Sequence, residues 1–259
     1  MKIHPTAIID PKAELHETVE VGPYSVIDAD VQIGAGTVIE THVRIYSGSR
    51  IGKFNRIHHA TAIGGPPQNV GWDLNIKSGC IIGDNNVMRE YFNMHRSQEE
   101  GGHTTIGNGC FLMENVTVSH DSHLGNNVIM VHAAATSGHV DIQDNAFVSG
   151  LSAIHQFCTI GENSMIGGCS KIVKDIPPYA TADGNPATVI GLNAIGLKRA
   201  GFSPEARKKI KDAYKVIYHS NLNISQALKQ LAEENDPSPE VQKIRNFFEK
   251  SERGVTDHR

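Results

Sequence analysis

A group of histidines lies near the middle of the 259-residue chain, between positions 120 and 155, and their side chains are the ones best suited to chemistry. Three of them, His120, His139 and His155, follow one another at intervals of roughly 18 residues, close to the length of one coil in a stacked repeat. An unperturbed imidazole titrates near neutral pH and can serve there as a general base. A row of polar rings is costly unless a substrate or partner uses it, so the row predicts a catalytic or binding site.

The element that must hold these histidines is a six-residue repeat. An Ile, Leu, Val or Met recurs at every sixth position through residues 3–63, 82–94 and 106–172, and Thr136 is the one exception. Neither an α-helix nor an alternating strand has a period of six. Such hexads are typical of a parallel β-helix, in which three of them form one triangular coil of about 18 residues.

We therefore predict a mainly β protein, with a parallel β-helix over residues 1–190 and a C-terminal α-helical domain over residues 191–259. Two stretches rich in Gly, Pro and charge interrupt the hexads at about 64–81 and 95–105, and we expect loops that build a binding surface. Ser203 followed by Pro204 marks a helix start, leading into 206–220. Further helices are expected near 225–234 and 239–252.

Composition excludes several classes of function. A net charge of −4 argues against a general nucleic-acid binder, and no apolar run of about 18 residues is present to span a membrane. The four cysteines form no CxxC pair, so we expect small buried residues in a reducing compartment. The N-terminal stretch is not an apolar signal, and we expect a soluble, cytoplasmic protein.

Basic side chains gather at the start of the helical domain, with only Glu205 and Asp212 as nearby acids. They form either a solvated helix face or a dock for an acidic carrier protein or a nucleotide diphosphate, and the sequence leaves both open. This basic cluster consists of Lys198, Arg199, Arg207, Lys208, Lys209, Lys211 and Lys215.

Short motifs surround the histidines and continue toward the C-terminus: Val118-Ser119-His120-Asp121, Ser137-Gly138-His139-Val140, Ala153-Ile154-His155-Gln156-Phe157-Cys158, Asp183-Gly184-Asn185-Pro186 and Gly196-Leu197-Lys198-Arg199. Together they closely resemble the acyl-[acyl-carrier-protein]–UDP-N-acetylglucosamine O-acyltransferases, which begin lipid A synthesis in Gram-negative bacteria. The resemblance covers nearly the whole chain, including the helical domain.

The resemblance implies a left-handed coil and a homotrimer of parallel prisms with active sites between the subunits. It implies transfer of a 3-hydroxyacyl chain from the phosphopantetheine of acyl carrier protein to the 3-position of a UDP-N-acetylglucosamine-type sugar, with no metal and no cofactor of the enzyme's own. His120 would be the general base, and the Gly138 N–H would hold the oxyanion. Asp121 would orient or charge-balance the imidazole, or would simply be solvated.

The remaining positions of the family pattern that this chain matches fall into three groups. Two residues of the first interrupted stretch would contact the sugar and the acyl chain: Gln68 and Asn69. The positions that would bind the UDP-sugar are His139, His155, Gln156, Asn193 and Arg199. Those that would measure the length of the acyl chain are Met165, Gly168 and Lys171.

Departures from the family pattern surround the acceptor and the end of the acyl tunnel and leave His120 unchanged. A usual lysine of the first loop is replaced by Gly71, with Lys77 as a candidate substitute for its charge. One hypothesis is an acceptor with a 3-amino group, which would yield an amide. The other departures are Asn69 for an aspartate, Thr117 and Pro186 for histidines, and Ala200 for an arginine.

Several alternatives stay open at this point. An N-acyltransferase acting later in the same pathway would carry an extra N-terminal domain, whereas hexads here begin at Ile3. A hexapeptide coenzyme-A acyltransferase would not need the helical tail. A zinc hydrolyase would use His120, His123 and His139 from two subunits. A purely structural β-helix would tolerate the loss of His120.

Overall fold

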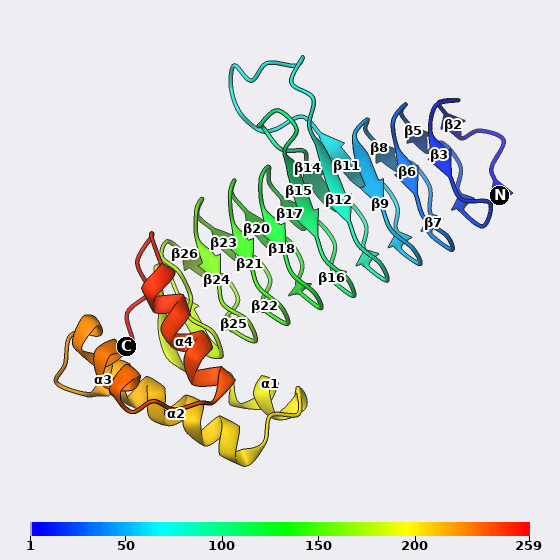
Figure 1. Cartoon of the computed structure of the whole chain (residues 1–259). Coiled ribbons are helices and arrows are strands. Elements are labelled where there is room, and N and C mark those ends of the chain that lie inside the picture. The colour runs from blue at the N-terminus through cyan, green and yellow to red at the C-terminus, as the bar shows by residue number, and fades with distance from the viewer. Residues whose placement is uncertain (1) are drawn as a thin grey trace.

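The structure, a computed structural model, describes residues 2–259. The chain coils into a long three-sided prism of short strands, and helices lie at the C-terminal end of that prism (Figure 1). Neighbouring strands along the prism are parallel, and only the final pair, β27 and β28, is antiparallel. The predicted parallel β-helix followed by C-terminal helices is confirmed.

Three sheets form the sides of the prism. Sheet A contains β1 (Lys2–Ile3), β4 (Glu20–Val21), β7 (Val38–Ile39), β10 (Arg56–Ile57), β13 (Val87–Met88), β16 (Phe111–Leu112), β19 (Ile129–Met130), β22 (Phe147–Val148), β25 (Met165–Ile166), β27 (Ala180–Gly184) and β28 (Ala187–Leu192). Sheet B contains β2 (Ile8–Ile9), β5 (Val26–Ile27), β8 (Arg44–Ile45), β11 (Ala62–Gly65), β14 (Asn93–His95), β17 (Thr117–Val118), β20 (Ala135–Thr136), β23 (Ala153–Ile154) and β26 (Lys171–Ile172). Sheet C contains β3 (Glu14–Leu15), β6 (Gln32–Ile33), β9 (Ser49–Ile51), β12 (Gly79–Ile82), β15 (His103–Ile106), β18 (His123–Leu124), β21 (Asp141–Ile142) and β24 (Thr159–Ile160).

Each hexad supplies one strand and one corner of a coil. The aliphatic residue at the sixth position points into the prism, and Ile57 and Ile154 are completely or almost completely buried there. The position four residues later is buried too, by smaller side chains such as Val116 and Ala146. Coils stack so that aliphatic side chains form one continuous core, which a single hexad could not bury alone.

Corners of the coils need a backbone conformation that side chains usually avoid. Asp121, His139 and Phe157 all have positive φ angles, of 58°, 58° and 65°. A non-glycine residue in this region costs roughly 1 kcal/mol or more, and such residues persist only where the surrounding structure fixes them. Hydrogen bonding between successive coils does so here, because the His139 N–H donates to the His120 carbonyl at 3.1 Å.

Two loops leave the prism on the same side, and we call them the first loop (residues 66–78) and the second loop (residues 96–102). Both interrupted stretches predicted from the sequence are longer than these loops, because their ends pair as parts of β11, β12, β14 and β15. The loops contact each other: the Trp72 indole N–H donates to the Gln98 carbonyl at 3.0 Å. Arg96 lies over the Trp72 ring.

The C-terminal part contains α1 (Ala194–Arg199), α2 (Pro204–His219), α3 (Ile224–Glu233) and α4 (Pro239–Lys250). Ser203 caps α2 by accepting from the Ala206 N–H at 3.1 Å, with Pro204 as the first helical residue, as predicted. The short α1 was not predicted. Its glycine, Gly196, gives a weak helix signal, and the helix is held by the Asn193 side chain, which accepts from the Gly196 N–H at 3.0 Å.

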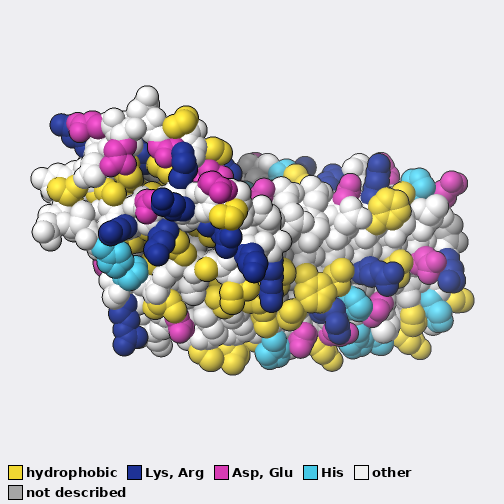
Figure 2. Space-filling view, turned by 90° about the horizontal axis from the view of Figure 1, so that it is seen from below, with side chains coloured by type: hydrophobic (Ala, Val, Ile, Leu, Met, Phe, Trp, Pro, Cys, Tyr) yellow, Lys and Arg dark blue, Asp and Glu magenta, His cyan; other side chains and the backbone are white. Residues whose placement is uncertain are grey.

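The basic cluster lies at this end of the molecule, where Figure 2 shows Lys and Arg side chains gathered over the helices. Lys209 pairs with Asp236 at 2.8 Å, while Lys211 and Lys215 line a mostly apolar cavity of about 550 Å³. No helix within residues 2–259 is long and apolar enough to cross a membrane.

Candidate active site

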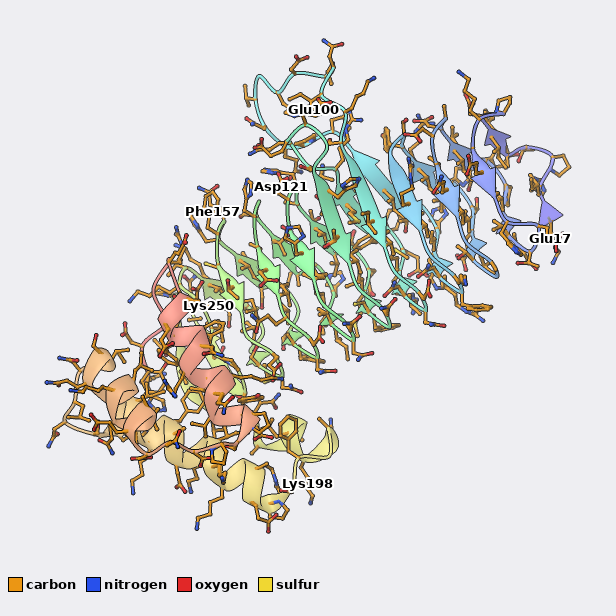
Figure 3. All side chains as sticks on the ribbon, in the orientation of Figure 1. Glu17, Glu100, Asp121, Phe157, Lys198 and Lys250 are labelled. Atoms are coloured by element: carbon orange, nitrogen blue, oxygen red, sulfur yellow. The ribbon has the colours of Figure 1, made fainter. Side chains whose placement is uncertain are left out.

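The candidate site lies on the prism edge where sheets B and C meet. His120 and Asp121 form the corner between β17 and β18, and His139 and Phe157 occupy the same edge in the next coils. The rings of His120 and His139 meet edge to face with centroids 5.4 Å apart, and Phe157 stacks on His139 at 4.9 Å. Figure 3 shows Asp121 and Phe157 along this edge, on the side from which the two loops project.

Asp121 is the electrostatic centre of the site. One carboxylate oxygen accepts from the Ser97 hydroxyl, and the other accepts from the His120 ring at 2.8 Å and the Gln98 N–H at 3.1 Å. Burial alone would raise the pKa of Asp121, but these hydrogen bonds outweigh it and hold the pKa below its ordinary value. The carboxylate is therefore ionised at neutral pH.

The charge on Asp121 fixes the state of His120. A carboxylate can only accept, so His120 donates its Nδ1–H and its Nε2 is left as the basic nitrogen. Nε2 makes no hydrogen bond with any of residues 2–259. The side chain is mostly buried but reaches the surface, with 15% of its area exposed. The pair therefore presents a basic ring nitrogen toward the surface, a geometry that suits proton transfer.

A buried polar group under this corner explains the one interruption in the aliphatic run. Thr136 takes an inward position, where its hydroxyl accepts from the Ser119 N–H at 2.9 Å. The Ser119 hydroxyl donates to the Thr136 carbonyl at 2.7 Å, and the Ser122 hydroxyl donates to the Ser137 carbonyl at 3.0 Å. The corner that carries His120 is thus held from inside the core by hydrogen bonds.

Gly138 lies directly beneath the His120 ring. A Cβ atom at this position would be 2.4 Å from the ring carbon Cε1, so any other residue would displace the imidazole. The Gly138 N–H makes no hydrogen bond within residues 2–259. A free backbone donor therefore lies beside the basic nitrogen, where it is available to an oxyanion.

The two loops bring further groups to the edge. The Gln98 amide donates to His139 Nε2 at 3.1 Å, and its oxygen accepts from the Asn69 side chain at 3.1 Å. Asn69 is thereby linked to the histidine row, whereas Gln68 is an exposed neighbour with no such contact among residues 2–259. Gly71 lies at the exposed tip of the first loop.

His95 was missed by the sequence analysis. Its Nδ1–H donates to the Pro66 carbonyl at 2.8 Å, and its buried Nε2 has no hydrogen-bond partner within the described chain. Burial lowers the pKa of His95, and the nearby His120 acts in the same direction. The ring is held neutral with an unused acceptor nitrogen.

Ser97, Gln98 and Phe157 were missed as well. Phe157 lies 18 residues beyond His139, so the coil length would have found it. The two loop residues follow no repeat, and no signal in the sequence would have placed them.

His155 and Gln156 lie one coil further along the same edge, and both are exposed. His155 contacts Arg253, from the far end of the chain, at 2.9 Å. Together with His120, Asp121 and His139 these residues occupy one edge of the prism, as the 18-residue spacing predicted.

The other predicted residues lie elsewhere on the prism. Asn193 and Arg199 line a cavity with Met165, a residue of sheet A. Sheet A is the side of the triangle that does not touch the edge shared by sheets B and C. Figure 3 shows Lys198 of α1 on the side of the molecule opposite Asp121. Gly168 is at the corner between sheets A and B, and Lys171 is exposed on sheet B.

A metal ion would find three ligand atoms here. Ligand atoms of His120, Asp121 and His139 all lie within 4.8 Å of one another. Both Asp121 oxygens already accept hydrogen bonds, and His123 stands apart with its ring against the Thr105 hydroxyl at 2.9 Å. Among residues 2–259, His123 is not part of this group of ligand atoms.

Comparisons with known proteins decide the family. A family model described as UDP N-acetylglucosamine O-acyltransferase, domain 2, matches residues 175–256. A curated acyl-[acyl-carrier-protein]–UDP-N-acetylglucosamine O-acyltransferase from Burkholderia mallei is 49% identical over 98% of each chain. The chain belongs to this acyltransferase family.

Solved structures agree with that assignment. A UDP-N-acetylglucosamine acyltransferase from Bacteroides fragilis is 40% identical, with a TM-score of 0.93 over 97% of this chain and 98% of that one. The enzyme from Francisella novicida is 34% identical, with a TM-score of 0.95 over 98% and 94%. These matches confirm the left-handed coil that the resemblance implied.

Proposed function

We propose that this acyltransferase moves a 3-hydroxyacyl chain from acyl carrier protein to the 3-position of a UDP-N-acetylglucosamine-type sugar, with His120 as the general base. The observation that carries the proposal is the His120–Asp121 pair, 2.8 Å apart, with Nε2 open and a free Gly138 N–H beside it. This pairing supplies a base and an oxyanion donor at one point.

The chemistry follows from these positions. Nε2 of His120 takes the proton from the sugar 3-hydroxyl while its oxygen attacks the thioester carbonyl carbon. Asp121 stabilises the imidazolium that forms, and the Gly138 N–H stabilises the tetrahedral oxyanion. The intermediate then collapses, the C–S bond breaks, and the leaving sulfur receives the proton from His120. The acyl group arrives on the phosphopantetheine of the carrier protein, so the reaction needs no cofactor of the enzyme's own.

The same proposal includes a homotrimer. Asn193 and Arg199 are expected to bind the sugar nucleotide with His139 and His155, yet they lie across the prism from that edge. A neighbouring subunit in a closed ring would bring its sheet A face to this edge. The site would then be built from two chains.

We place the reaction in the cytoplasm. All four cysteines are free, as suits a protein kept in a reducing compartment. Cys80, Cys110 and Cys158 are buried as predicted, but the prediction is wrong for Cys169, which is exposed at a corner of its coil.

The test is turnover of a 3-hydroxyacyl carrier-protein thioester with the UDP-sugar. His120→Ala should lower kcat by roughly 10²–10⁴ while the fold is unchanged by circular dichroism. His123→Ala is the matched control. The exposed ring of His123 lies on β18, three residues after His120, and is not part of the His120–Asp121 pair. Equal rates for the two variants would refute the assignment of His120.

A second candidate acceptor carries a 3-amino group. Gly71 and Thr117 replace a lysine and a histidine of the family pattern on the side where the acceptor would bind, and Lys77 is exposed at the end of the first loop. A neutral amine attacks through its lone pair before it loses a proton, so it depends less on a general base than a hydroxyl does. If this second acceptor is the true one, the 3-amino sugar should be turned over faster than the 3-hydroxyl sugar with one acyl donor; equal or hydroxyl-favoured rates would reject it.

A further inference from the structure

The C-terminal segment, residues 251–259, returns to the β-helix and pairs with its last coil. The Asp175 N–H donates to the Gly254 carbonyl at 2.9 Å, and the Thr256 N–H donates to the Asp175 carbonyl at 2.8 Å. The Ser251 hydroxyl donates to the Asp175 carboxylate at 2.6 Å. Backbone and side-chain hydrogen bonds therefore hold this segment, and its side chains have defined places.

Arg253 of this segment reaches the histidine row. Its Nε–H donates to the Val173 carbonyl at 3.1 Å, and Nη2 lies 2.9 Å from Nδ1 of His155. A guanidinium has donors only, so Nδ1 must accept and the ring proton must be on Nε2. The same Nδ1 is 3.2 Å from the Gln156 carbonyl, which can only accept. Nδ1 cannot accept from the arginine and donate to the carbonyl in the same tautomer. The contact with Arg253 is the shorter one, and this arginine is also anchored on Val173, so we assign the ring proton to Nε2.

The segment is shaped to present this arginine. Gly254 follows Arg253 with a φ of +82°, a conformation that lets the chain turn from Arg253 into the paired residues beyond. Lys174 also holds the segment, through an ion pair with Asp257 at 3.1 Å. This ion pair does not involve His155.

We propose that Arg253 is a positioning residue for the acyl transfer. It holds His155 with the proton on Nε2, so that Nε2–H is a ready donor to an oxygen of the UDP-sugar. Nε2 makes no hydrogen bond with residues 2–259, and the ring is exposed to an incoming ligand. The inference rests on the proposed function, in which His155 contacts the sugar nucleotide.

Steady-state kinetics of the full-length enzyme test the proposal. Arg253→Ala should raise the KM for the UDP-sugar roughly 5- to 30-fold, because the His155 donor to the sugar is no longer held in place, with kcat within about twofold of the parent. Arg253→Lys should recover part of the loss, because an ammonium still donates. Lys174→Ala removes the ion pair to Asp257 but no hydrogen bond of Arg253 or His155, and should leave the KM unchanged.

A double variant separates Arg253 from the segment as a whole. In a His155→Ala background, Arg253→Ala should change the KM no further, because the ring it positions is gone. An equal KM increase in both backgrounds, or a fall in kcat with unchanged KM, would overturn the inference. If His155→Ala alone leaves the KM unchanged, the proposed role of His155 fails and Arg253's role with it. If Arg253→Ala lowers the thermal midpoint of unfolding, the KM is instead compared for Arg253→Lys alone and for Arg253→Lys combined with His155→Ala.

Discussion

At the scale of single residues, Asp121 connects His120, the proposed base, to the second loop. Its carboxylate holds the His120 ring on one side and accepts from Ser97 and the Gln98 N–H on the other. The backbone N–H of Asp121 donates to the Thr104 hydroxyl at 2.8 Å, so the residue is held from both ends. Few groups of the site are as completely determined by their neighbours.

Asp121→Asn should lower kcat by about 10²–10⁴, because an amide no longer favours the His120 tautomer with a free Nε2. Ser97 and the Gln98 N–H both donate, and the amide offers only one oxygen to them. The measurement is turnover of this variant compared with that of Asp144→Asn. Asp144 also accepts from a neighbouring coil, through the Asn126 N–H at 2.7 Å, but it lies at the corner between sheets C and A, away from the histidine row. Similar losses in both variants would mean that only the coil was disturbed.

The same carboxylate predicts a pH dependence of stability. Its folded pKa lies below the ordinary value of 3.8, so the folded state binds the proton less readily than the unfolded chain. The stabilisation is therefore complete above about pH 4 and is lost as the pH falls through the folded pKa. Urea unfolding of the parent and Asp121→Asn should give a stability difference that is constant near neutrality and shrinks in acid. A difference that grows in acid would contradict the assignment.

At the scale of elements, the corner between β17 and β18 is held from within the core. Thr136 supplies the acceptor for the Ser119 N–H, and Ser119 returns a hydrogen bond to the Thr136 carbonyl. In the next coil, where the inward residue is Ile154, the corresponding Ser137 N–H donates to the Ile154 backbone carbonyl at 2.9 Å. At Thr136 the side-chain hydroxyl takes this N–H instead, and the backbone carbonyl accepts from the Ser119 hydroxyl. The interrupted repeat is thus explained by the site that it supports.

Thr136→Val keeps the shape of the side chain and removes the acceptor. We expect a loss of about 0.5–1.5 kcal/mol in the free energy of unfolding, the usual net value of one hydrogen bond, because the Ser119 N–H can pair with the backbone carbonyl of residue 136 as Ser137 does with Ile154. Ile154→Val, at the same inward position one coil later, is the control and should cost about 0.5–1.5 kcal/mol for its small cavity. If only Thr136→Val also lowers kcat, the corner is being positioned through this hydrogen bond. Equal effects of both variants on kcat would show that Thr136 merely fills space.

The elements also mark how far the sequence carries. The hexads predict the coil and its 18-residue spacing, and so place His139 and His155 on the edge of His120. They do not predict the contacts of Ser97 and Gln98, because the second loop has no repeat and its path is set by Asp121 and Trp72 after folding. The sequence also does not predict the tautomer of His155, because it depends on Arg253, which is 98 residues away and outside the repeat.

At the scale of the whole molecule, the expected substrate contacts lie on two sides of one prism. The histidine row occupies the edge between sheets B and C, and Arg199 lies against sheet A with Met165 and Phe147. Because the core of the prism is filled by packed side chains, no bend of one chain can bring the two together. A catalytic unit containing both must draw them from different copies.

Mixing two inactive variants tests that arrangement. In a ring of three, an intact site needs His120 from one chain and Arg199 from its neighbour. When His120→Ala and Arg199→Ala chains are co-expressed in equal amounts and assemble at random, about a quarter of the sites should contain both wild-type residues. Activity should therefore recover to about a quarter of the parent value. Mixing the separately purified trimers without exchange should recover none. If each site were complete within one chain, every site in the co-expressed mixture would lack one residue, and the activity would stay at the level of the single variants.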